Sequence, residues 1–144
     1  MEIVTNIVAA DEDEYSSVGE SGCPLDEWSG IETFGLDTVK IAVLHSLLTG
    51  DPLQTALDLY EPVYVSVRET VILRLADEVL EKLAVLDEEA LENIASELAA
   101  TEAFEREQWV AEDVLEQLTA LAELAQLAES QGQALFVWMC IVPG

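Results

Sequence analysis

The amino-acid sequence predicts an α+β fold in which four or five helices pack on a small mixed sheet. Three observations lead to this prediction. Residues 2–9 are apolar and rich in β-branched side chains, residues 134–142 form a continuous apolar run, and apolar side chains recur at helical spacing between them. The sheet is therefore expected to include strands from both ends of the chain. An all-α bundle is the alternative fold class.

The length and composition are those of one acidic domain, residues 1–144. Hydrophobic residues make up 51% of the 144 positions, which is enough for one core. The first predicted strand, at 2–9, ends at the acidic run 11–14. Residues 15–35 are rich in Ser, Gly and Pro and predict a long loop with one helical turn near 25–28.

The middle of the chain predicts helices first and strands after them. The first helix is expected to begin after Asp37, a suitable N-cap, and to end at Gly50. Asp51 and Pro52 then start a short helix. Residues 61–75 are β-branched and roughly alternating, which predicts one or two central strands.

Three helices and a final strand are predicted for the second half. Asp77 opens a helix that runs to about residue 86, Asp87 caps one that runs to about residue 104, and the longest spans about 111–130. Gly132 ends the last helix. The apolar run 134–142 fits a strand buried on both faces better than a helix.

The charge balance excludes several classes of partner. The chain has 30 acidic and 5 basic residues, for a formal net charge of −25. Direct nucleic-acid binding needs Lys and Arg along the phosphates, and an anionic membrane surface repels an acidic protein. No apolar run reaches the roughly 18 residues that cross a bilayer. We therefore expect neither nucleic-acid binding nor membrane insertion.

The N-terminus and the cysteines predict a cytoplasmic location. The chain starts MEIVTNIVAADEDE, without the basic region of a secretory leader. Two cysteines, Cys23 and Cys140, do not form a disulfide framework.

Few residues carry a recognisable chemistry, and neither a metal nor a cofactor is predicted. One histidine and two cysteines are too few for a usual zinc site without carboxylates. The acidic run 11–14 is followed by Tyr15 and Ser16, where a calcium loop needs an oxygen ligand and a glycine. His45 is expected to be a partly buried helix side chain that hydrogen-bonds a neighbour. A general base near neutral pH is the alternative role for it.

Four segments resemble the YfbM-like family of small bacterial proteins. They are LHSLLTG at 44–50, TNIVAADEDEY at 5–15, LADEVLEKLAVLDEE at 75–89 and the C-terminal ALFVWMCIV. The resemblance implies a single α+β domain. It implies no activity and no functional residues beyond an interest in His45, because the family is essentially uncharacterised.

The predicted function is that of a non-enzymatic acidic binding protein. An acidic surface over a solid core attracts a basic protein partner at long range, as immunity proteins and DNA-mimicking inhibitors do. The candidate contact residues are Glu105, Glu107, Glu112 and Asp113, with Trp109 as the anchor unless it packs in the core. One alternative is a small hydrolase built on His45 and nearby carboxylates. Another is a salt-adapted protein whose charge has no binding role. The sequence does not indicate an oligomeric state.

Overall fold

The computed structural model describes residues 2–21, 24–34, 37–66, 70–106 and 108–142. Its strands are β1 (Glu2–Ala10), β2 (Gly30–Phe34), β3 (Tyr64–Val65), β4 (Thr70–Arg74) and β5 (Ala134–Val142). The α-helices within these ranges are α1 (Tyr15–Glu20), α2 (Thr38–Thr49), α3 (Leu53–Leu59), α4 (Asp77–Ala84), α5 (Glu88–Ala100), α6 (Glu102–Glu105) and α7 (Ala111–Gln131). Two short 3₁₀ turns, η1 (Glu12–Glu14) and η2 (Pro24–Asp26), flank α1. The α+β prediction is confirmed.

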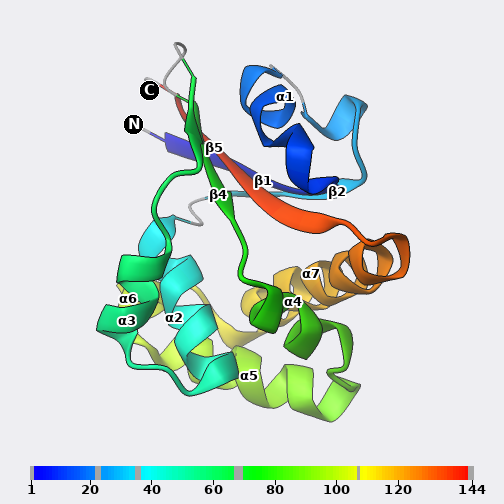
Figure 1. The fold of residues 1–144 in the computed structure, drawn as a ribbon. Helices are drawn as coiled ribbons and strands as arrows, with labels where there is room; N and C mark the ends of the chain where they lie inside the picture. The colour runs from blue at the N-terminus through cyan, green and yellow to red at the C-terminus, as the bar shows by residue number, and fades with distance from the viewer. Residues whose placement is uncertain (1, 22–23, 35–36, 67–69, 107, 143–144) are drawn as a thin grey trace.

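One sheet joins the two ends of the described chain. Its strand order is β2-β1-β5-β4-β3, and every pairing is antiparallel, so the sheet is not mixed (Figure 1). β5 lies between β1 and β4, and its pairing with β1 runs from Glu2↔Val142 to Ala10↔Ala134. Residues 134–139 are buried, as expected for a central strand with apolar side chains on both faces.

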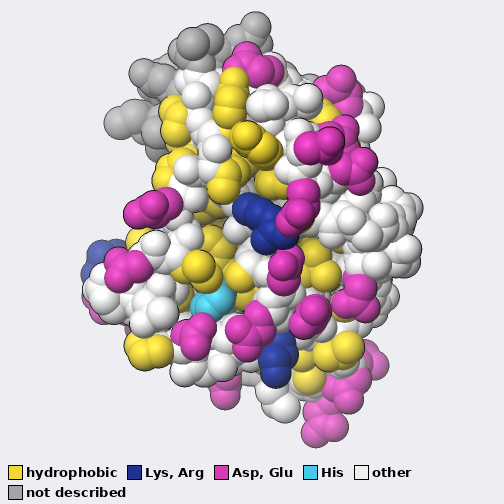
Figure 2. Space-filling view, in the orientation of Figure 1, with side chains coloured by type: hydrophobic (Ala, Val, Ile, Leu, Met, Phe, Trp, Pro, Cys, Tyr) yellow, Lys and Arg dark blue, Asp and Glu magenta, His cyan; other side chains and the backbone are white. Residues whose placement is uncertain are grey.

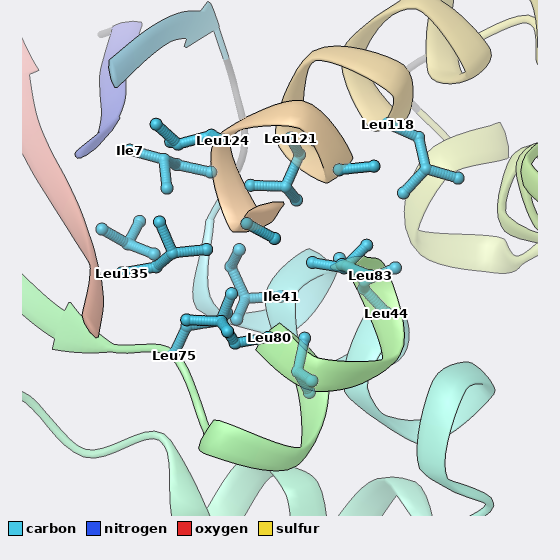
Figure 3. Packing of buried hydrophobic residues seen from close by; sticks show 14 of the residues in the cluster. Ile7, Ile41, Leu44, Leu75, Leu80, Leu83, Leu118, Leu121, Leu124 and Leu135 are labelled. Atoms are coloured by element: carbon cyan, nitrogen blue, oxygen red, sulfur yellow. The ribbon is translucent and has the colours of Figure 1, made fainter. Parts of the chain in front are cut away.

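The main core lies between one face of the sheet and the long helices. Figure 3 shows Ile7 of β1 and Leu135 of β5 pointing toward Leu121 and Leu124 of α7. Side chains from α2 and α4 complete the same cluster, among them Ile41, Leu44, Leu80 and Leu83. Burial of this cluster is the main source of stability in the fold.

A second, smaller cluster lies on the opposite face of the sheet. It contains Val8, Ile72, Phe136 and Trp138, and α1 adds Val18 to it. Figure 1 shows α1 on the side of the sheet away from the long helices. The indole N–H of Trp138 donates to the backbone carbonyl of Ser21 at 3.2 Å, and this bond connects the end of α1 to the central strand β5.

The predicted loop at 15–35 is the main error in the sequence-based fold. The structure places α1 and the edge strand β2 in this region, whereas η2 agrees with the helical turn predicted near 25–28. β2 pairs with β1 in the register Ile7↔Ile31, and the carbonyl of Ser29 accepts from the N–H of Ala9 at 2.9 Å. The strand is five residues long and begins at a glycine, so its own sequence is a weak strand signal. Pairing with the long strand β1 stabilises it instead.

The helix caps at Asp37 and Asp87 are confirmed. Their side chains accept the N–H groups of Lys40 at 3.0 Å and Ala90 at 2.8 Å. The helix predicted from Asp87 to residue 104 is divided, because Thr101 is extended with ψ 152°. Its hydroxyl donates to the carbonyl of Leu98 at 2.6 Å, which ends α5 before α6 begins.

None of the helices in the described ranges combines the length and the apolar character that a membrane span requires.

Candidate functional site

His45 lies at the centre of a buried hydrogen-bond network. The side chain is on α2 and is only 2% exposed. Its Nδ1 lies 2.9 Å from the hydroxyl of Tyr60, and its Nε2 lies 2.9 Å from Oδ2 of Asp51. The N–H of Ala76 also donates to the Tyr60 hydroxyl at 3.3 Å. The histidine network, defined as these four residues, joins α2, the end of α3 and the start of α4.

The turn after α2 holds Asp51 in position. Gly50 has φ 83°, a left-handed conformation that a residue with a side chain rarely adopts. The hydroxyl of Ser46 donates to the Asp51 carbonyl at 2.6 Å, and the Asp51 N–H donates to the Thr49 hydroxyl at 3.2 Å. These contacts direct the Asp51 carboxylate toward His45.

One arrangement of hydrogens satisfies the whole network. Because the Tyr60 hydroxyl accepts from Ala76, its own hydrogen is available for Nδ1 of His45. We therefore assign the histidine proton to Nε2, from which it is donated to Asp51. Nδ1 then accepts a hydrogen bond and Nε2 donates one, so both nitrogens of the buried ring have a partner.

The hydrogen bonds of the network engage both ring nitrogens of His45. In a Ser-His-Asp triad the nucleophile bonds Nε2 of the histidine and the carboxylate bonds Nδ1, whereas here the buried Tyr60 hydroxyl bonds Nδ1 and Asp51 bonds Nε2. Burial raises the pKa of Tyr60 to about 12, so the phenolate does not form at neutral pH. The neighbouring Ser46 uses its hydroxyl on the Asp51 carbonyl. Both hydroxyls beside His45 are thus engaged in hydrogen bonds.

The pH dependence of stability tests a structural role for the network. The hydrogen bond from His45 is the main cause that holds the pKa of Asp51 below its ordinary value of 3.8, and partial burial opposes it. Because the pKa is lowered in the folded state, the stabilisation is complete above that ordinary value and is lost as the pH falls through the folded pKa. We expect Asp51→Asn to be less stable than wild type at pH 7, with a difference that shrinks as the pH is lowered below 3.8.

The control for this experiment is Asp58→Asn. Asp58 is exposed on α3 and accepts from Gln54 at 3.2 Å, so the change removes the same charge without affecting a histidine. Urea unfolding at pH 7 and at a pH below 3.8 gives both differences. Equal stability of the two variants at both pH values would contradict the role of Asp51.

The predicted acidic contact residues lie around the junction of α6 and α7. Glu105 ends α6, and Glu112 and Asp113 lie in the first turn of α7; all three are exposed. Glu107 lies outside the described residues. The junction also exposes the apolar side chain of Val110. The acidic junction, defined as Glu105, Val110, Glu112 and Asp113, therefore has an apolar residue among its carboxylates.

Trp109 is half-buried beside this junction. Its ring packs edge-on against Phe104, with ring centroids 5.5 Å apart and an interplanar angle of 81°. It also lines a mainly apolar cavity of about 30 Å³, large enough for a water molecule, together with Lys40 and Gln117. Part of the indole thus contributes to the core and part lies at the surface. Its role as a binding anchor stays a prediction.

Three basic side chains in the described residues pair with carboxylates. Lys40 is only 2% exposed, and its Nζ lies 3.6 Å from the Asp37 carboxylate. Arg74 forms ion pairs with Glu12 and Asp77. The sequence did not indicate this, because Lys40 looks like a surface residue until the helix is packed. The remaining carboxylates dominate the surface charge, and Figure 2 shows them scattered over one face.

A groove runs between α2 and α6. It has a volume of about 410 Å³, and α3 contributes Leu53 to it. The α2–α6 groove is lined by Val39, Val43, Ser46, Leu47, Leu53, Thr101, Glu102, Ala103 and Arg106. Arg106 forms an ion pair with Glu102, and both side chains are highly exposed. A neighbouring hollow, which shares Glu102 and Arg106, adds Glu105. The groove therefore leads from an apolar floor to the acidic junction.

The described residues contain no group of three or more His, Cys, Asp or Glu side chains that could hold a metal ion. Cys140 is half-buried on β5, and Cys23 lies outside the part of the chain that the structure describes.

No family model, curated protein or solved structure matches this chain. The resemblance to the YfbM-like family therefore stays a prediction.

Proposed function

We propose that this protein is a non-enzymatic acidic binding protein that captures a basic protein partner. The observation that carries the proposal is the internal pairing of Lys40, Arg74 and Arg106 with carboxylates. These pairs use most of the positive charge of a chain whose net charge is −25. A surface potential of one sign steers an oppositely charged partner and accelerates its association.

The acidic junction is the contact surface we favour. Its three carboxylates are exposed, they are close in the sequence, and they lie beside the exposed Val110 and the half-buried Trp109. Interfaces commonly combine an apolar or aromatic centre with a polar rim. An immunity-like or inhibitor-like role fits this surface best. Proteins that bind nucleic acids present Lys and Arg to the phosphates, and the carboxylates of an acidic protein can bind the same Lys and Arg.

Association kinetics test the proposal. Affinity capture from the native cell identifies a partner, and stopped-flow mixing with that purified partner then gives the two rate constants. We expect the association rate constant to fall by about tenfold or more between roughly 0.01 and 0.15 M NaCl, as the screening length shortens from about 30 to about 8 Å. The dissociation rate constant is expected to change much less, because short-range contacts hold the complex.

A matched pair of charge variants locates the contact. The test variant combines Glu105→Gln, Glu112→Gln and Asp113→Asn, and a further Trp109→Ala variant is expected to dissociate faster. The control neutralises three exposed acids outside the acidic junction, namely Glu89→Gln at the start of α5 and Glu123→Gln and Glu129→Gln in the second half of α7. Both triple variants lose three charges, so only a local contact makes the first associate more slowly than the second. An acidic partner, or an association rate that is independent of salt, would refute the electrostatic proposal.

A further inference from the structure

Helix α2 is apolar on more than its core side. Ile41 and Leu44 face the main core, where both are buried. Val39, Val43 and Leu47 follow one another at a spacing of four residues, which places them along a second side of the helix. A helix that is apolar all round is normally covered on all sides. Val43 is buried in the main core cluster and Leu47 packs against that cluster, whereas Val39 is 45% exposed, so only the N-terminal end of this stripe is open.

The second stripe forms the floor of the α2–α6 groove. Leu53, at the start of α3, adds a further apolar side chain that is 42% exposed, and Ala103 of α6 lines the opposite wall. From Val39 to Leu47 the helix rises about 12 Å, which matches about two turns of another helix. A groove of this form accepts the apolar stripe of an amphipathic helix.

The charges beside the groove determine which helix fits. Arg106 is matched by Glu102, so Glu105 contributes surplus negative charge to the adjoining hollow. Glu112 and Asp113, in the first turn of α7, are exposed acids as well. A second copy of this chain would bring another 25 net negative charges to the same place, which makes self-association unfavourable at low salt. A helix flanked by Lys and Arg has the complementary charge.

We propose that the α2–α6 groove binds an amphipathic helix of the basic partner. Its apolar stripe lies on the exposed Val39 and Leu53, and its basic flanks lie toward Glu105. This inference rests on the proposed function, because it assigns the contact that a basic partner makes. It adds a helical binding element and an apolar contact that charge alone does not require.

A synthetic helix provides the probe. It is a fluorescent peptide of about 15 residues, long enough to form helix, with leucines along one stripe and lysines on both flanks. A second peptide keeps the leucines and replaces every lysine with glutamate. Fluorescence anisotropy against the full chain is expected to show binding of the lysine peptide alone. Equal binding of the glutamate peptide would overturn the assignment of a basic helix.

Neutral substitutions then locate the site without changing the charge. Val39→Asn combined with Leu53→Asn is expected to weaken binding of the lysine peptide about tenfold or more. The control combines Val65→Asn with Val85→Asn, two exposed valines outside the groove, and is expected to leave the affinity within about twofold. All four side chains are exposed, so both variants are expected to fold, which circular dichroism checks. Equal weakening by both variants would overturn the location.

Two further measurements separate the competing outcomes. Sedimentation of the chain alone detects self-association, and a dimer abolished by the Val39→Asn and Leu53→Asn variant would assign the groove to a second copy.

Kinetics with the captured partner test the groove separately from the proposed function. If the groove variant binds that partner with unchanged affinity and unchanged salt dependence, the groove inference is wrong and the acidic binding function stands. If the captured partner shows no salt-dependent association, the proposed function itself fails.

Discussion

Replacing Trp138 with alanine is expected to lower the free energy of unfolding by about 3–5 kcal/mol. Trp138 is buried at the centre of the sheet, on β5, where it packs in the cluster beneath α1. The change removes the largest side chain of that cluster and leaves a cavity that the surrounding strands cannot fill. It also leaves the carbonyl of Ser21 without the indole N–H that donates to it. A loss of this size is a large fraction of the stability of a domain.

Trp28→Ala is the matched control for this change. Trp28 packs against the same cluster, but it is only half-buried, and its indole N–H donates to the carboxylate of Glu14 at 3.3 Å. We expect a clearly smaller loss, because less apolar surface returns to water. Urea unfolding followed by circular dichroism gives both values. Equal losses for the two tryptophans would contradict the central position of Trp138 in the smaller cluster.

Leu83→Ala is expected to lower the free energy of unfolding by about 2–5 kcal/mol. Leu83 lies on α4, is fully buried and belongs to the main core beside α2 and α7 (Figure 3). Its removal opens a cavity between elements that neighbouring helices hold in place, so the cavity does not close completely. Thermal and urea unfolding measure the change.

Val85→Ala is the matched control, because it shortens an exposed apolar side chain close to Leu83 in the sequence. Val85 follows α4 two residues after Leu83 and is 76% exposed. Its loss is expected to change stability by no more than about 0.5 kcal/mol. A variant of Leu83 as stable as the variant of Val85 would show that α4 does not pack on the core in the way described.

The sequence predicted the elements whose signals are local. Asp37 and Asp87 cap helices through bonds to residues three positions later, and Gly50 ends a helix by its own left-handed conformation. The run at 134–142 is apolar on both faces, which is typical of a central strand, and the structure confirms that position. The antiparallel direction of every pairing is not a local property, and the predicted mixed sheet missed it.

The histidine network was predictable only in outline. A helix histidine that hydrogen-bonds a neighbour was the prediction for His45, and the structure shows two such bonds. Asp51 lies six residues away, across a helix end, and Tyr60 lies fifteen residues away, at the end of the next helix. Their meeting depends on how α3 packs against α2, and no spacing along the chain encodes that packing.

The sequence by itself determined the sign and size of the charge, the fold class, most helix boundaries and the central strand, because each depends on composition or on residues within a few positions of one another. The tertiary structure alone decided that β2 pairs with β1, that Lys40 is buried and that α6 lies beside the second apolar stripe of α2. Val39 and Val43 were visible in the sequence as apolar residues of the first predicted helix. Only the packing of α6 and the start of α3 beside them makes a groove, because a groove is a relation between elements that are distant in the chain.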